Sequence, residues 1–348
     1  MACCYEHRYV PMLSDDPALR RRLLLTTVVV VALPFLFIYL FEFAVNRFLV
    51  PILESQGYGP YYGHFYVAPG FAAVVVVGGL AVQAWYGPQT VLRSIGAQAV
   101  TSTSNPEVHA AVSRLSQQAD IEPPAVKITH NDAPNAAAIS GPSGDGTIVL
   151  TTGLLDELDD EELTAVLAHE VSHLANRDAT VMTVAWLLPT VTYYLAIASA
   201  YLLYRLPRSL VGGSSGGDDG GAAKAIIVLV ATALMTLAIS ALFWAASVLV
   251  HRLLSQYREF AADRGAAVLT GNPGALASAL ETMDETMEDV PDKDLRALDG
   301  GAEALYAAPL ESRMFTDVEL VSTDIFPETH PPTSERIERL HDLAGEIQ

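Results

Sequence analysis

Residues 165–178 read "AVLAHEVSHLANRD", a stretch that combines a metal-ligand spacing with the last charges before a long apolar run. His169 and His173 are four residues apart, so on a helix they lie on one face, one turn apart. Such a pair can bind one tetrahedral zinc ion at about 2.0–2.1 Å. Glu170 lies beside them, where a carboxylate can accept a proton from a metal-bound water. The spacing predicts a catalytic zinc site; the alternative is a helix with two ordinary histidines.

The helix that carries this motif is expected to begin near Asp159. Asp159 followed by Glu162 has the pattern of a capping box, and the apolar residues after it recur at helical spacing. Upstream, "AVKITH" and "TIVLTT" predict two short strands, and the weaker "NAAAIS" between them predicts an edge strand. This part of the chain is therefore expected to be α+β.

Four runs of the sequence carry no charged residue, and 51% of all residues are hydrophobic. Each run is long enough to cross a bilayer as a helix, which takes about 20 residues. Aromatic residues near several ends fit an interfacial belt. Buried core helices, the alternative, seldom contain such long uncharged stretches. We therefore predict four membrane spans, at residues 23–41, 65–86, 179–204 and 225–250.

A third zinc ligand is expected in "YREFAAD". Glu259 and Asp263 are also four residues apart, so one helix face can present a ligand and a carboxylate that orients a ligand histidine. His173 lies six residues before the third predicted span, and Glu259 lies nine residues after the fourth. A hairpin of these spans would bring the two residues together at one membrane face.

The basic residues before the first span predict which face this is. Arg20, Arg21 and Arg22 favour a cytoplasmic N-terminus by the positive-inside rule. Four spans then leave the predicted zinc site in the cytoplasm. The loop with Arg205 and Lys224 would lie outside, against the same rule.

Composition excludes several other classes of protein. The net charge is −20 and only three of the 20 basic residues are lysines, which suggests adaptation to a salty cytoplasm and argues against nucleic acid as a partner. Cys3 and Cys4 are the only cysteines, too few for a disulfide framework. The Gly-rich residues 212–221 lack the Gly-Lys-Ser/Thr of a phosphate loop, so no ATP-binding motif is present.

Three segments together, "LAHEVSHLANRD", "YREFAADRGAAVLTGNPGALASALE" and "HPPTSERIERL", resemble the HtpX-type membrane zinc metalloproteases. These enzymes are gluzincins and relatives of the CaaX prenyl endopeptidases. The resemblance covers the chain from about Leu23 to its end. It implies that His169, His173 and Glu259 bind one zinc ion and that Glu170 is the general base.

The same resemblance implies three further site residues. Asn135 in "NAAA" corresponds to the family's Asn that holds substrate backbone, although Ala137 replaces the usual Phe. His330 and Arg336 in "HPPTSER" correspond to residues that stabilise the oxyanion of the tetrahedral intermediate. From the residues alone, His330 before two prolines would be a loop residue.

The expected architecture is an α-helical integral membrane protein of four spans with a discontinuous α+β zinc-metalloprotease domain at the cytoplasmic face. In chain order we expect a cytoplasmic tail (1–22), span 1 (23–41), an external loop (42–64), span 2 (65–86), the first protease part (87–178), span 3 (179–204), a Gly-rich external loop (205–224), span 4 (225–250) and the second protease part (251–348).

The expected function is zinc-dependent endoproteolysis of membrane or misfolded proteins at the cytoplasmic face of the plasma membrane, as quality control without ATP. The alternative within the class is processing of prenylated peptides, whose enzymes carry about seven spans. An intramembrane protease is disfavoured by Arg177 and Asp178 beside the motif. A transporter or scaffold is disfavoured because the spans carry no charge to mark an ion path and a scaffold needs no Glu170.

Overall fold

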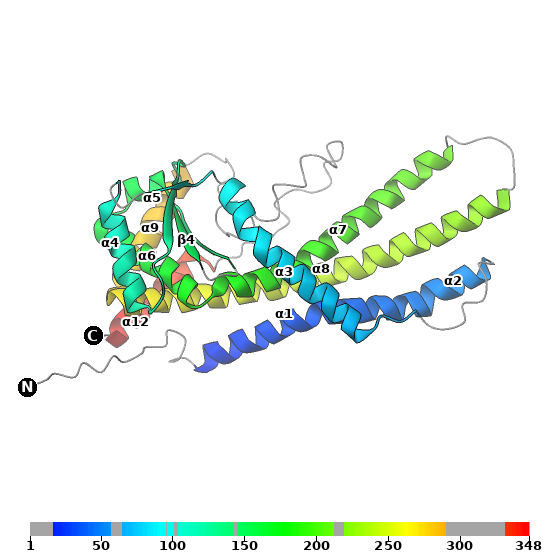
Figure 1. The fold of residues 1–348 in the computed structure, drawn as a ribbon, viewed down its shortest axis with the longest axis horizontal. Coiled ribbons are helices and arrows are strands. Elements are labelled where there is room, and N and C mark those ends of the chain that lie inside the picture. Colours follow the sequence, from blue (N-terminus) through cyan, green and yellow to red (C-terminus); the bar gives the residue numbers. More distant parts are fainter. Residues whose placement is uncertain are drawn as a thin grey trace, which may run out of the picture. The chain divides into compact units, whose positions relative to one another are not determined.

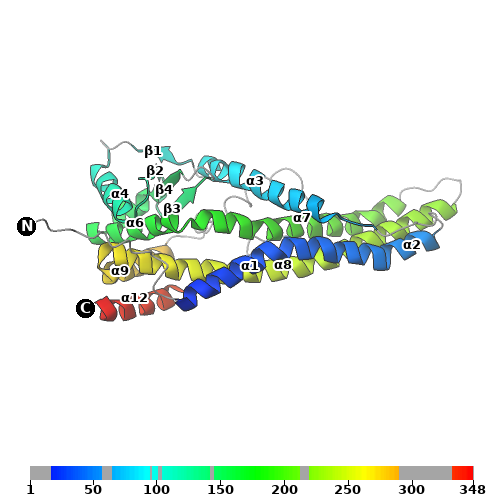
Figure 2. The same cartoon turned by 60° about the horizontal axis from the view of Figure 1, so that its bottom comes forward.

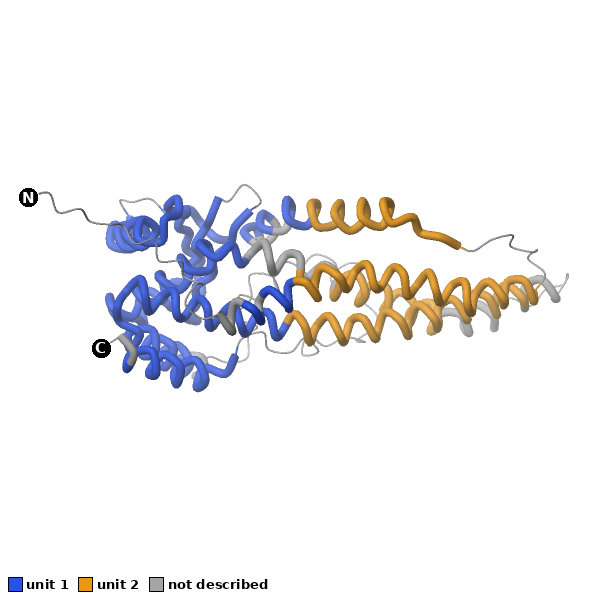
Figure 3. The backbone as a smooth tube through the Cα atoms, turned by 90° about the horizontal axis from the view of Figure 1, so that it is seen from below, with its two compact units in different colours: residues 1–27, 83–183, 252–348 blue, residues 28–82, 184–251 orange. Residues whose placement is uncertain are grey.

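The computed structural model describes residues 17–56, 65–94, 96–100, 104–141, 145–211, 219–289 and 331–347 (Figure 1). Cys3, Cys4 and His330 lie outside the described residues. The chain divides into two compact units (Figure 3). Unit 1 comprises residues 1–27, 83–183 and 252–348, and unit 2 comprises residues 28–82 and 184–251.

Unit 1 contains a four-stranded sheet with the order β1-β2-β4-β3, labelled in Figure 2. β2 (Ala125–Thr129) and β4 (Gly146–Thr151) are parallel, and both were expected from the sequence. β3 (Ala136–Ser140) pairs antiparallel with β4 at the edge of the sheet, so the expected edge strand is confirmed. The two-residue β1 (Gln98–Ala99) was not expected.

Helices pack against this sheet or against one another because their apolar stripes need a partner. They are α4 (Pro106–Gln118), α5 (Thr152–Glu157), α6 (Asp160–Ala175), α9 (Pro273–Asp289) and α12 (Thr333–Ile347). One continuous core joins them to β2 and β4, with fully buried leucines at its centre. Each such leucine contributes about 1.5–3 kcal/mol by leaving water. These leucines are Leu115, Leu150, Leu154, Leu167, Leu276 and Leu340.

The start of α6 is fixed as the sequence predicted. The Asp159 carboxylate accepts hydrogen bonds from the backbone N–H groups of Glu161 and Glu162, both at 2.9 Å. Glu162 in turn accepts a bond from the backbone N–H of Asp159 at 3.1 Å, which completes the capping box. Its other oxygen contacts Ser278 on α9. The helix with the two histidines is thus held at its first turn.

Unit 2 contains most of the apolar helical sequence. α1 (Pro17–Ala44) continues through a π-helical turn (Val45–Leu49) into α2 (Val50–Ser55), so the first half of the predicted external loop 42–64 is helical. α3 (Pro69–Ser94) begins after residue 65, the predicted start of span 2, and residues 65–68 form no regular element. There Asn46 exchanges two 2.7 Å hydrogen bonds with the backbone of Phe65, and Glu42 accepts one from the backbone N–H of Val67.

Two further helices run through both units. α7 spans Asp178–Val211, and α8 spans Asp219–Thr270, so the predicted fourth span and the helix with Glu259 are one continuous helix. α8 ends where Gly271 adopts φ +67°, a left-handed conformation that glycine tolerates. Both helices extend into the predicted loop 205–224.

Among the described residues, three helices are long and apolar enough to cross a membrane: Leu24–Ser55, Pro69–Tyr86 and Lys224–Thr270. Large apolar side chains such as Phe71 and Val74 are exposed on them, which suits a lipid-facing surface. Within α7 the apolar stretch Val191–Tyr204 is shorter. The described part of the chain thus has three candidate membrane spans, and the fourth span stays a prediction.

Candidate metal centre

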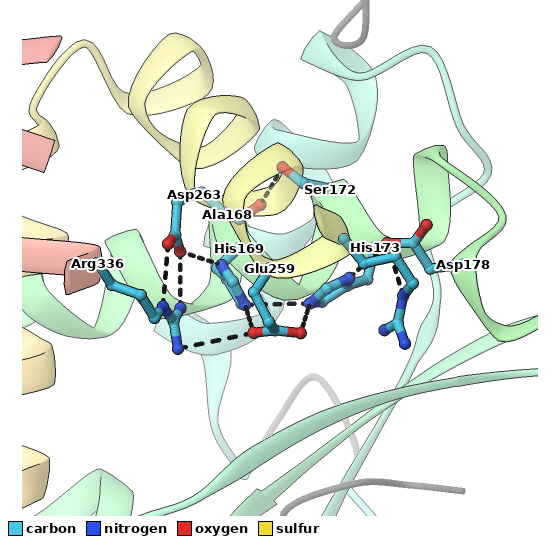
Figure 4. A network of polar contacts seen from close by, with 9 residues as sticks. Ala168, His169, Ser172, His173, Asp178, Glu259, Asp263 and Arg336 are labelled. Carbon is cyan, nitrogen blue, oxygen red and sulfur yellow. Dashed lines mark hydrogen bonds and ion pairs between the residues drawn. The ribbon is translucent and has the colours of Figure 1, made fainter. Parts of the chain in front are cut away.

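α6 brings the two motif histidines together in unit 1. The Nε2 atoms of His169 and His173 lie 3.0 Å apart, with the ring planes almost perpendicular (Figure 4). Both side chains are buried. The i, i+4 spacing thus places both ring nitrogens at one point, as expected for a helix.

Glu259 on α8 completes the group. One carboxylate oxygen lies 3.5 Å from Nε2 of His169, and the other lies 3.5 Å from Nε2 of His173 (Figure 4). Glu259 is only 2% exposed. The three potential ligand atoms lie within 4.8 Å of one another, so one ion can contact all three.

The second nitrogen of each ring contacts a buried carboxylate. Nδ1 of His169 lies 3.0 Å from Asp263, and Nδ1 of His173 lies 2.6 Å from Asp178. For His173 the contact is a hydrogen bond, and for His169 it is a close approach of the carboxylate to Nδ1. Both favour the tautomer in which the proton lies on Nδ1 and Nε2 keeps its lone pair. The Nε2 lone pairs of His169 and His173 and the carboxylate of Glu259 then face one point. These three groups repel one another unless a cation lies between them. Imidazole and carboxylate donors suit zinc.

The charge around His169 also favours a cation. Burial opposes a charged ring, but the nearby carboxylates of Asp263 and Glu259 outweigh it and raise the pKa of His169 from 6.5 to about 9 when no metal is bound. The carboxylates thus stabilise positive charge at this position.

α12 brings Arg336 into the same group. Its guanidinium donates hydrogen bonds from Nε and Nη2 to the two oxygens of Asp263, and Nη1 lies 3.6 Å from Glu259 (Figure 4). Arg336 is only 8% exposed. The structure thus places Arg336 beside Asp263 and Glu259, with two of its three nitrogens bonded to Asp263.

Glu170 lies on the helix of the two histidines, and Asn135 lies just before β3, a strand that contacts this helix. Glu170 is buried on α6, one residue after His169. Asn135 directly precedes β3, and its backbone N–H and C=O both bond to Thr151. That pairing directs the N–H and C=O groups of Ala136, Ala138 and Ser140 away from β4, because pairing alternates along an antiparallel strand.

Two residues at this site were not singled out from the sequence, Asp178 and Arg258. Asp178 contacts His173, and Nε of Arg258 lies 3.4 Å from the same carboxylate oxygen. From the sequence, Asp178 served only as a charge beside the motif, at the end of the polar segment and as an argument against an intramembrane protease. Its position five residues after a candidate ligand was the available signal.

The comparisons with known proteins agree with this geometry. The model of peptidase family M48 matches residues 102–344, which contain every residue of the candidate site. The chain belongs to peptidase family M48. M48 enzymes are metalloproteases that are zinc-dependent in general, and this M48 chain holds a His-His-Glu group of the required kind.

Several relatives carry the name protease HtpX homolog. One from Methanosarcina mazei is 36% identical over 268 residues, which cover 77% of this chain and 83% of the relative. One from Methanosarcina acetivorans is 32% identical over 304 residues, covering 87% and 92%. The resemblance to HtpX-type M48 proteases is thus confirmed, and the chain is a membrane metalloprotease. A crystal structure of S. mikatae Ste24p aligns over 92% of this chain and 66% of that one, with 16% identity and a TM-score of 0.42.

Proposed function

We propose that this M48 metalloprotease cleaves membrane or misfolded proteins at the cytoplasmic face of the plasma membrane, as a step of protein quality control. The observation that carries the chemistry is the buried group of His169, His173 and Glu259 with Glu170 on the same helix. Arg20, Arg21 and Arg22 before the first apolar helix support the cytoplasmic orientation.

His169, His173 and Glu259 would hold one zinc ion. When bound, zinc lowers the pKa of its water to about 7 and polarises the scissile carbonyl. Glu170 accepts the proton of the attacking water and transfers it to the nitrogen of the leaving amine. Burial keeps bulk water away from the ligand atoms and strengthens their electrostatic effect.

Arg336 and His330 are proposed to stabilise the oxyanion of the tetrahedral intermediate. For Arg336 this role falls to Nη1, because Nε and Nη2 are bonded to Asp263. Asp263 is proposed to orient His169 through Nδ1.

β3 is proposed to bind the substrate backbone. Its outward N–H and C=O groups can pair with an extended peptide by strand addition, and Asn135 lies at the start of this edge. Strand addition requires a segment that is unfolded over several residues. This requirement supports unfolded or damaged polypeptides as substrates.

The test compares wild type with Glu170→Gln, both purified in detergent and high salt without chelators. We expect about one zinc per chain in both, and casein cleavage reduced at least about 10²-fold in the variant, because general bases contribute 10²–10⁴ in rate. An absence of zinc from both proteins would refute the metal site. Zinc in both with cleavage of prenylated peptides alone would replace quality control by CaaX-type processing.

A further inference from the structure

Asp178 and Arg258 form a second carboxylate-arginine pair at the metal centre. Oδ2 of Asp178 lies 2.6 Å from Nδ1 of His173 and 3.4 Å from Nε of Arg258. Asp178 is 7% exposed, and the side chain of Arg258 is 14% exposed. A carboxylate this deeply buried requires partners, and these two contacts supply them.

The local backbone explains why Asp178 reaches His173. α6 ends at Ala175, and Arg177 adopts φ 58°, a left-handed conformation that is uncommon outside glycine. α7 then begins at Asp178. Asp178 comes five residues after His173, and the tight connection between the helices brings its carboxylate to Nδ1 of His173. The other ring nitrogen, Nε2, is the one that faces Glu259.

The other ligand histidine has the same kind of neighbours. His169 contacts Asp263 through Nδ1, and Arg336 donates two hydrogen bonds to Asp263. Each histidine ring therefore contacts an aspartate, and that aspartate contacts an arginine. The two aspartate-arginine pairs come from different elements. On α8, Arg258 and Glu259 are adjacent, so one residue contacts Asp178 while the next faces both Nε2 atoms.

We propose that Asp178 and Arg258 are positioning residues for the metal centre. Asp178 fixes the tautomer and orientation of His173, so that Nε2 presents its lone pair to the metal. Arg258 acts through Asp178 by holding its carboxylate in place. This inference rests on the proposed metal site and deepens it. A pair that only joined α7 to α8 would affect stability and leave metal affinity unchanged.

The experiment measures the affinity of the detergent-solubilised full chain for Zn²⁺ alone by competition with a chromophoric chelator. We expect Asp178→Ala to lower the affinity about 10- to 100-fold, the usual effect of removing such a partner. Asp178→Asn keeps the shape of the side chain and should cost less. Co²⁺ substitution gives an independent readout, because a misaligned His173 changes the visible absorption of the bound ion.

A double-mutant cycle isolates the role of Arg258. Arg258→Gln should lower zinc affinity when Asp178 is present and should add nothing in the Asp178→Asn background. Arg264→Gln, elsewhere on α8, is the matched control and should leave affinity unchanged. The melting temperatures of the metal-free proteins show whether each variant folds. If Asp178→Ala does not fold, Asp178→Asn and the cycle decide.

Two results would overturn the inference. One is unchanged zinc affinity in both Asp178 variants while the wild type binds zinc. The other is an equal loss from Arg258→Gln with and without Asp178. A wild type that binds no zinc would overturn the proposed metal site and this inference together. The two results above would overturn this inference alone.

Discussion

Arg336 donates two hydrogen bonds to Asp263, at 2.9 and 2.6 Å, although 73 residues separate them in the sequence. The pair joins α12 to the helix that carries Glu259, and both side chains are buried. An arginine fork matched to a carboxylate has a single geometry, so the pair also fixes where α12 lies within unit 1.

Replacing Arg336 by Met should therefore destabilise unit 1. It leaves Asp263 buried without its main partner, a change that typically costs about 3–5 kcal/mol. Arg339→Met is the matched control on the same helix, because Arg339 is half exposed and pairs with Glu335 and the Phe260 ring at the surface. It should cost no more than about 1 kcal/mol. Thermal melting in detergent compares the two; equal shifts would contradict the prediction.

Removing Glu259 should abolish stabilisation by zinc. Glu259→Gln replaces the only carboxylate of the ligand group by a neutral amide, a poor zinc ligand. Added zinc should raise the melting temperature of wild type, because a ligand that binds only the folded state stabilises it, and should leave the variant unchanged. Glu281→Gln on the exposed side of α9 should respond like wild type. A full zinc response in Glu259→Gln would remove Glu259 from the ligand set.

Gly153→Ala should disturb β3, the edge strand that is proposed to bind the substrate backbone. A Cβ at this position would lie 2.0 Å from the carbonyl oxygen of Asp132, so the loop that leads to Asn135 and β3 has to shift. Overpacking of this kind typically costs about 1–3 kcal/mol. We expect casein cleavage to fall while zinc content is kept. Gly274→Ala, whose Cβ would meet only Asn272 at 3.5 Å, should change neither quantity.

Salt should stabilise the protein. The net charge of −20 repels itself, and the screening length falls from about 10 Å at 0.1 M salt to about 3 Å at 1 M. We expect the melting temperature to rise with potassium chloride over this range. A flat or falling curve would contradict adaptation to a salty cytoplasm.

Local signals predicted much of unit 1. The capping box at Asp159, the apolar stripe of α6 and the strands β2, β3 and β4 follow from short sequence patterns, since each depends on neighbours along the chain. α12 was not predicted as an element. The predicted span 1 stops at residue 41, where the uncharged run ends, whereas helical structure continues through the π-helical turn to Ser55.

The candidate site was only partly predictable for a related reason. The i, i+4 spacing, which is a local property, indicated four of the residues: His169, His173, Glu259 and Asp263. The contact between Asp178 and His173 depends on the left-handed turn at Arg177, and the Arg258 contact depends on how α6 and α8 lie together. No local pattern encodes either of these.

The ligands come from two helices that are made at different times. A nascent chain that has been synthesised only through α7 contains both histidines and lacks Glu259. With this proposed ligand set, metal-dependent cleavage has to wait until the apolar part of α8 has left the ribosome. If these three residues bind the metal as proposed, their order along the chain delays proteolytic activity until most of the apolar helical sequence has been made.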